Sequence, residues 1–306
     1  MVDLDLSVSV AALALARSGK LGSAALRQLL AQVAEEETQG RSMALNDILA
    51  TAGVSRPEVN MSVSDAERDI EKGMALGIKA VPLSSSLYPK TLREINDAPP
   101  ILFVRGNIEQ LRHLPGVAVV GTRQATPHGL LIASRIAQML SDADWPIVSG
   151  LAMGIDAAAH EGAMKGKSYT IAVLAHGLEK ASPTMNRPLA DRILDSGGLW
   201  VSEHPVGVSA KPSAFVLRNR IQVGLSCASV IVEGADKSGS KTQAEFCLQN
   251  RRALFTVMAD PSSGVATMHE LPRILVQRGA VPLRSKADYP HMLEIIAKRA
   301  DALVND

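Results

Sequence analysis

The sequence predicts an α/β protein with an extended Rossmann-like, doubly wound, mostly parallel sheet and a small helical N-terminal module. From residue 79 onward, short apolar segments alternate with amphipathic ones, as in parallel sheets covered by helices on both faces. Before that point, apolar residues recur at spacings of three and four, which is typical of helices. We therefore expect a helical module over 1–78, a Rossmann-like domain over 79–290 and a C-terminal helix and tail over 291–306.

The composition describes a globular chain without a general affinity for polyanions. Its 306 residues are 46% hydrophobic and 21% charged, enough to bury a sizeable core. The net charge is +1, so an anionic partner must be held by a local cluster of Lys and Arg. The two cysteines, Cys227 and Cys247, lack the spacing of metal ligands and are expected to be buried thiols. We expect neither a metal nor a cofactor.

The N-terminal module should contain four short helices, within 10–18, 23–36, 43–52 and 62–77. Ser23 and Ser64 are the expected N-caps of the second and fourth. The apolar N-terminal run has no basic start, and no stretch is as long as a membrane span, so we expect a cytoplasmic protein.

The Rossmann-like domain should contain seven apolar strands separated by helical segments. The strands are expected in ILFVRG, VAVVGTR, PIVSG, YTIAVLAHG, LWVSE, SVIVEGA and ALFTVMADP. The helical segments are HGLLIASRIAQMLSDA, DAAAHEGAMKG, RPLADRILDSG, RNRIQVGLSCA, TQAEFCLQNRR and LPRILVQRGA.

Unusual loops follow three of the strands, where an open parallel sheet binds its ligands. In GTRQATPHG, Gly121 permits a tight turn and Arg123 supplies a guanidinium group. In SGLAMGID, Gly150 and Gly154 allow close backbone approach. Glycines in α/β proteins often only turn the chain, but several glycine-rich loops at one sheet edge favour an anion pocket.

The third loop, DKSGSKTQAE, places Ser238, Gly239 and Ser240 before a helix, where backbone amides can bind an anion. None of the three loops matches the G-x-G-x-x-G or G-x-x-x-x-G-K-[ST] fingerprint. An ordinary dehydrogenase or NTPase is therefore disfavoured.

Basic residues near these loops support an anionic ligand. FVLRNRIQVGLS places Arg218 and Arg220 near the expected start of a helix, where cations are unfavourable without a nearby anion. Arg123, Lys237 and Lys241 on neighbouring loops bring the possible positive groups to five. The alternative is that each arginine pairs with a local carboxylate such as Glu233 or Asp236.

Two further features allow two interpretations each. Phe215, just before RNR, is either a core residue or a face for base stacking. Asp156 and His160 are one helical turn apart and can interact. A bond that anchors the loop is expected there rather than acid–base catalysis, because no nucleophile stands beside them.

The chain resembles the DNA-processing protein A (DprA/Smf) family. The resemblance starts near LYPKTLREINDAPPILFVRGN, spans about two-thirds of the chain and rests on motifs in the same order. These motifs are GTR, SGLAMGID with AAH, AVLAHGLEK, NRPLADRI, GGLWVSEHP, FVLRNRIQVGLS, VIVEG and SGS.

This resemblance implies a homodimeric protein that binds and protects single-stranded DNA and helps load RecA during uptake of transforming DNA. It implies that Arg123, the SGS residues and the RNR arginines hold phosphates, and that Phe215 faces a base. The predicted binding residues are Gly121, Arg123, Gly150, Gly154, Phe215, Arg218, Asn219, Arg220, Lys237, Ser238, Gly239, Ser240 and Lys241.

The sequence departs from the family pattern at the rim of the predicted pocket. A small apolar pair and Thr-Ala usually follow SGS, but SGSKTQAE stands here. Arg251-Arg252 replaces Gly-Arg, Ala259-Asp260 replaces Pro-Gly, and Ser182 replaces a tyrosine. We expect no winged-helix tail of the kind that some members carry.

Two other functions remain open. Thr242 and Glu245 form a T-x-x-E spacing similar to that of LOG-type phosphoribohydrolases, which cleave nucleoside monophosphates. That resemblance implies Glu245 as the catalytic carboxylate and Arg220 as its electrostatic partner. The second alternative is a nucleotide-sensing defence protein that kept the pocket without the DNA role.

Overall fold

The computed structural model describes residues 6–235, 238–258 and 270–305. Within these residues, one mixed sheet has the strand order β1-β2-β6-β5-β4-β3-β7-β8-β9. The pairs β1–β2 and β2–β6 are antiparallel, and the other pairs are parallel. This confirms the predicted Rossmann-like, mostly parallel fold.

The strands are short and almost entirely buried, as expected for a sheet covered on both faces. They span Ile78–Pro82 (β1), Ile101–Gly106 (β2), Gly116–Val120 (β3), Ile147–Ser149 (β4), Thr170–Val173 (β5), Leu199–Ser202 (β6), Ser226–Ile231 (β7), Ala253–Val257 (β8) and Val281–Leu283 (β9). The two edge strands, β1 and β9, were not predicted from the sequence.

Alternate residues of the central strands enter different apolar clusters. Val119 and Val230 pack with α6 (Pro127–Asp142), α7 (Ile155–Ala163) and α12 (Tyr289–Asn305). Val120 and Ile231 pack on the opposite face. That face is covered by α9 (Pro212–Gly224), α10 (Gly239–Gln249) and α11 (Glu270–Gln277). The alternation fixes the strand register, because a slip by one residue would exchange the two faces.

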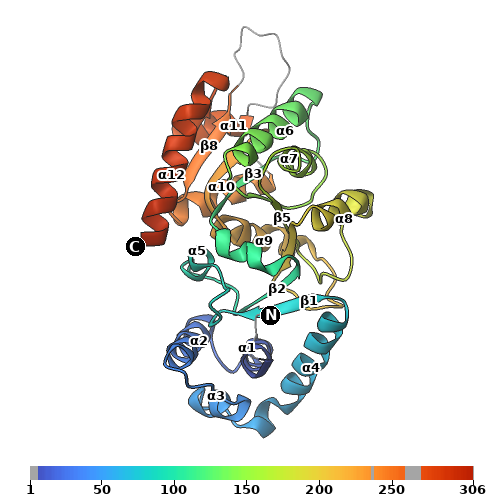
Figure 1. Ribbon diagram of the computed structural model, residues 1–306, viewed down its shortest axis with the longest axis vertical. Coiled ribbons are helices and arrows are strands. Elements are labelled where there is room, and N and C mark those ends of the chain that lie inside the picture. The colour runs from blue at the N-terminus through green and yellow to red at the C-terminus, as the bar shows by residue number, and fades with distance from the viewer. Residues whose placement is uncertain (1–5, 236–237, 259–269, 306) are drawn as a thin grey trace.

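The N-terminal module forms one end of the molecule (Figure 1). Its helices are α1 (Leu6–Ser18), α2 (Ser23–Thr38), α3 (Leu45–Thr51) and α4 (Arg56–Ala75). α1 lies between α2 and α4 and is buried on all sides from Val8 to Leu15. The module shares one apolar cluster with β1, β2, β5 and β6, so its position relative to the sheet is set by packing.

Both predicted N-caps were wrong. Gly22 occupies the N-cap position of α2, and Ser55 that of α4. The backbone amide of Ser55 donates to the Glu58 side chain at 2.8 Å, as in a capping box, so α4 begins well before Ser64.

The remaining α-helices of the described residues are α5 (Lys90–Arg93) and α8 (Arg187–Asp195). Cys227 and Cys247 are buried free thiols, which confirms that prediction. Among the helices of the described ranges, none has the length and hydropathy needed to cross a membrane.

Candidate functional site

A cavity of about 600 Å³ lies at the carboxyl ends of β3 and β7. From β3 the chain continues outward through β4, β5 and β6, and it then returns to place β7 on the other side of β3. Such a reversal of strand order is where doubly wound sheets bind ligands. The cavity is lined by Val120, Gly121, Thr122, Arg123, Gln124, Ala152, Asp156, Pro212, Phe215, Val216, Arg218, Asn219, Gln222, Ser238, Gly239, Ser240 and Gln243.

Arg123 and Phe215 meet at this cavity. Arg123 is exposed on the loop after β3, and Phe215 is half-buried in the first turn of α9. The guanidinium carbon lies 5.3 Å from the ring centroid, a cation–π distance. A positive group and an aromatic face thus line the same cavity.

Arg218 is buried in the wall of the cavity. Its Nη1 donates to the carbonyl oxygen of Val173 at the end of β5. Burial lowers the pKa of Arg218 to about 10, against the opposing effect of the nearby Asp156 carboxylate. A Cβ at Gly150 would lie 2.2 Å from Arg218 Nη1, so this glycine leaves the space that the guanidinium group occupies.

Asp156 anchors the loop after β4. Its carboxylate accepts hydrogen bonds from the backbone amides of Gly150 at 3.1 Å and Ala152 at 3.4 Å. Burial raises the pKa of Asp156, although Arg218 and these amides oppose the rise. The predicted Asp156–His160 contact is wrong, because His160 Nδ1 instead lies 2.7 Å from Thr170 Oγ1. The anchoring role of Asp156 is confirmed, with backbone amides as its partners.

The N-terminus of α10 forms the opposite wall. Ser238 is its N-cap residue, followed by Gly239 and Ser240, and all three line the cavity. Asn219 Nδ2 donates to the Gly239 carbonyl oxygen at 3.0 Å and so fastens α9 to this turn. Backbone amides of the first helical turn and the helix dipole favour an anion here.

Several predicted binding residues do not line the cavity. Gly154 has a φ of 79°, and a Cβ there would lie 2.4 Å from the Thr122 carbonyl oxygen. It thus allows the loops after β3 and β4 to approach. Gly150 makes room for Arg218, and Lys241 is a half-buried residue of α10 outside the lining. Lys237 lies outside the described residues.

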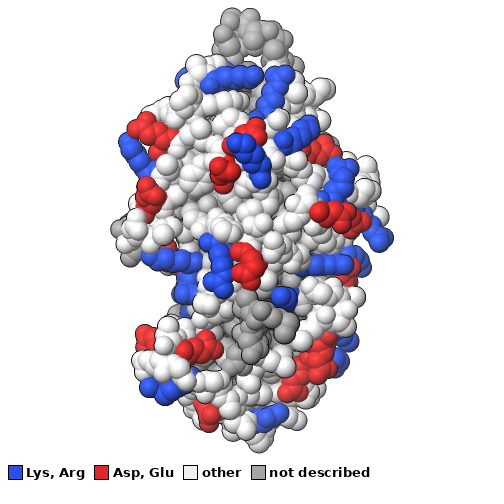
Figure 2. Space-filling model, viewed as in Figure 1, with Lys and Arg blue, Asp and Glu red and all other residues white. Residues whose placement is uncertain are grey.

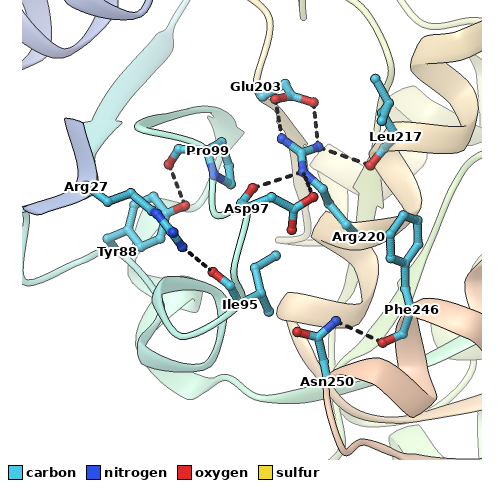
Figure 3. Close-up of polar contacts among 10 residues, drawn as sticks. All are labelled: Arg27, Tyr88, Ile95, Asp97, Pro99, Glu203, Leu217, Arg220, Phe246 and Asn250. Atoms are coloured by element: carbon cyan, nitrogen blue, oxygen red, sulfur yellow. Dashed lines mark hydrogen bonds and ion pairs between the residues drawn. The ribbon is translucent and has the colours of Figure 1, made fainter. Parts of the chain in front are cut away.

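Arg220 does not line the cavity and instead binds Glu203 and Asp97 (Figure 3). The prediction that the RNR arginines open a helix was also wrong. α9 begins at Pro212, which places Arg218 at its middle and Arg220 in its second half.

Glu233, the partner suggested for an arginine, instead accepts hydrogen bonds from the backbone amide of Thr126 at 2.9 Å and from its hydroxyl at 2.7 Å. It therefore stabilises the N-terminus of α6, where Thr126 is the N-cap residue.

Two buried amide side chains in the cavity lining, Gln222 and Gln243, were not predicted from the sequence. Gln222 Nε2 donates to Asn219 Oδ1 at 3.4 Å, and Gln243 Nε2 donates to Ser229 Oγ at 3.3 Å. Each follows a predicted binding residue, Asn219 or Ser240, by three positions on the same helix. Residues three positions apart lie on the same face of a helix, so this spacing could have identified both amides from the sequence.

The surface charge is mixed. On the face shown in Figure 2, Lys and Arg side chains are interspersed with Asp and Glu. Affinity for an anion must therefore come from the local arrangement in the cavity, as the net charge of +1 requires.

The phosphoribohydrolase alternative is not favoured by this geometry. Glu245 does not line the cavity, and its carboxylate lies 3.7 Å from Arg278 Nη1. Arg220, its proposed partner, is held by Glu203 and Asp97. The two residues are therefore engaged in separate ion pairs.

Comparison with known proteins decides the family. The sequence profile described as DNA recombination-mediator protein A matches residues 79–294, more than two-thirds of the 306 residues. The chain belongs to this family. The predicted DprA/Smf resemblance is thus confirmed.

Relatives of the DNA recombination-mediator protein A family match over long stretches. DNA processing protein DprA of Bacillus subtilis is 36% identical over 215 residues, which cover 69% of this chain and 70% of that protein. DprA of Streptococcus pneumoniae is 32% identical over 268 residues, covering 86% and 91% respectively.

Two solved structures of DprA proteins are similar to this fold. The Streptococcus pneumoniae structure gives a TM-score of 0.71 at 30% identity, covering 90% of this chain and 94% of that one. The Helicobacter pylori structure is described for its mode of binding single-stranded DNA. It gives a TM-score of 0.59 at 27% identity, covering 67% of this chain and 92% of that one.

Proposed function

We propose that this protein binds single-stranded DNA in the cavity between the ends of β3 and β7. The observation that carries the proposal is the contact of Arg123 with Phe215, beside the N-terminus of α10 in one cavity. A cation and backbone amides bind phosphate, and an aromatic face stacks on any base. Together they suit a strand bound without sequence preference.

Each group has a separate role in this proposal. Arg123 and the amides of Ser238, Gly239 and Ser240 hold phosphates, and Phe215 stacks on a base. Lys241, and Lys237 outside the described residues, remain candidate phosphate ligands. Arg218 and Asn219 form the wall between these groups. Gly121 and Gly154 permit the close approach of the loops, and Gly150 leaves room for the Arg218 side chain.

The comparisons support this proposal. The family is described as a recombination mediator, and a related structure is described for its binding of single-stranded DNA. We extend the proposal to a cytoplasmic homodimer that protects the bound strand and loads RecA onto it for recombination or transformation.

A mononucleotide is the second candidate ligand. A volume of about 600 Å³ lies within the range of small-molecule pockets, so a single nucleotide fits. A nucleotide-sensing role would then replace the DNA role.

Fluorescence anisotropy with labelled oligo-dT, a matching duplex and labelled AMP separates these candidates. The proposal predicts tight binding of oligo-dT that weakens steeply as salt rises. Tight binding of AMP without affinity for oligo-dT would instead support the nucleotide sensor. A salt-independent response to oligo-dT would contradict the proposed phosphate contacts.

A further inference from the structure

Arg218 and Arg220 are two residues apart on α9 but have different surroundings. Positions two apart on a helix point in nearly opposite directions. Arg218 lines the cavity, whereas Arg220 does not. The sequence motif RNR therefore contains two arginines in structurally distinct places.

The guanidinium group of Arg220 is engaged at every nitrogen (Figure 3). Nη1 and Nη2 donate to the two carboxylate oxygens of Glu203 at 2.8 Å and 2.6 Å, a bidentate pair. Nε lies 3.0 Å from both the carbonyl oxygen and the Oδ2 atom of Asp97. A phosphate ligand would have to displace these partners.

These partners belong to separate parts of the fold. Glu203 directly follows β6, and Asp97 lies in the segment between β1 and β2. Arg220 therefore fastens α9 to the antiparallel edge of the sheet. The segment containing Asp97 is also held by α2, because Arg27 Nη1 donates to the Ile95 carbonyl oxygen at 3.0 Å (Figure 3).

The pair is largely shielded from water, with side-chain exposures of 10% for Arg220 and 22% for Glu203. Burial acts to raise the pKa of the Glu203 carboxyl, but hydrogen bonds and charge from Arg220 hold it below its ordinary value. Removing either partner would leave a mostly buried group unpaired, so the pair resists rearrangement.

We infer that Arg220 is a positioning residue, not a phosphate ligand. Its pair with Glu203 holds α9 in the orientation in which Phe215, Arg218 and Asn219 line the cavity. This inference rests on the proposed function, since the ligand that the positioned residues meet is the single strand.

Salt dependence separates positioning from phosphate binding. Anisotropy titrations with oligo-dT at several salt concentrations compare the wild type with Arg220→Met. A positioning role predicts affinity about tenfold weaker at each salt concentration, with an unchanged slope against salt. If Arg220 instead bound a phosphate, Arg220→Met would remove about one phosphate contact. The slope of log affinity against log salt concentration would then be shallower by about 0.7.

For Glu203→Gln, the two roles of Arg220 predict opposite changes in oligo-dT affinity. Because glutamine has nearly the same shape as glutamate, this variant also serves if Arg220→Met fails to fold. A positioning role predicts weaker binding, because α9 loses its anchor. If Arg220 met phosphate, removal of the competing carboxylate would strengthen binding. Stronger binding by Glu203→Gln, or a shallower slope for Arg220→Met, would overturn the inference.

Two controls complete the experiment. Arg68→Met, which removes an exposed arginine of α4, should leave both affinity and slope unchanged. In a double-mutant cycle, Phe215→Ala should cost less affinity in the Arg220→Met background than in the wild type, and full additivity would count against positioning. Failure of the wild type to bind oligo-dT would overturn the proposed function itself.

Discussion

The guanidinium carbon of Arg123 lies 5.3 Å from the centre of the Phe215 ring. The two residues come from the loop after β3 and from the first turn of α9, and both line the same cavity. In the proposed function, this contact joins the group that holds a phosphate to the group that stacks on a base. The spacing suits neighbouring parts of one nucleotide chain.

Replacement of Phe215 by alanine should weaken oligo-dT binding by about 1–3 kcal/mol, because a stacking face is lost. The dependence on salt should be unchanged, since no charge is removed. Anisotropy titrations provide the measurement, with Phe215→Tyr as a control that keeps the ring. An unaltered affinity in Phe215→Ala would assign this side chain to packing alone.

Substitution of two glycines by alanine should have different effects: Gly150→Ala should lower oligo-dT affinity, and Gly162→Ala should lower the stability of the fold. In Gly150→Ala, the added Cβ lies 2.2 Å from Arg218 Nη1 and would push this side chain from its place in the wall. We expect reduced oligo-dT affinity with a small loss of stability, because the far end of a side chain can move.

In the matched variant Gly162→Ala, the added Cβ lies 2.1 Å from the backbone oxygen of Ser134, where α7 packs on α6. Backbone cannot move as easily, so the free energy of unfolding should fall by about 1–3 kcal/mol. Oligo-dT affinity per folded molecule should not change. Denaturant unfolding measures stability, and anisotropy measures oligo-dT affinity. A large loss of stability in Gly150→Ala, together with a loss of affinity in Gly162→Ala, would contradict the prediction.

His160 should make stability depend on pH in the acid range. Burial lowers its pKa from 6.5 to about 3, so between these values the unfolded chain binds a proton that the folded chain does not. Stability should therefore fall as pH falls through this window, by about 1.4 kcal/mol per unit.

The difference between the wild type and His160→Asn isolates this effect. Asp156 acts in the opposite sense, because burial raises its pKa and the folded state then retains the proton more strongly. Asp156 is present in both proteins, so its contribution largely cancels. Urea unfolding between pH 7 and pH 4 should show a flatter profile for His160→Asn, whereas parallel profiles would contradict the prediction.

Glu245→Gln should leave oligo-dT affinity unchanged. The carboxylate lies outside the cavity lining and 3.7 Å from Arg278 Nη1. The phosphoribohydrolase alternative instead makes this carboxylate essential for release of free adenine from AMP. Chromatography of AMP incubated with each protein tests that point, and adenine released by the wild type but not by Glu245→Gln would restore the alternative.

The central sheet and the position of the cavity could be predicted because they depend on local patterns. Apolar strands such as Gly116–Val120 and the glycine-rich loops that follow them are visible as short motifs. In a parallel sheet these loops must meet at one edge. Gly121, Arg123 and Ser238 were therefore identified correctly as neighbours of one cavity.

The surroundings of the arginines could not be predicted because their partners are distant in sequence. Arg220 binds Asp97, 123 residues away, and Arg218 binds the carbonyl of Val173, 45 residues away. Their pairing depends on tertiary packing. By contrast, the start of α4 was predictable, because Ser55 and Glu58 have the spacing of a capping box.

The salt dependence of oligo-dT binding by the wild type and Arg123→Ala tests the central claim most directly. If Arg123 holds a phosphate, the wild type should bind more weakly as salt rises, and the variant should show a slope shallower by about 0.7. Arg68→Met should match the wild type. Identical slopes for the wild type and Arg123→Ala would contradict the proposed contact between this cavity and the DNA backbone.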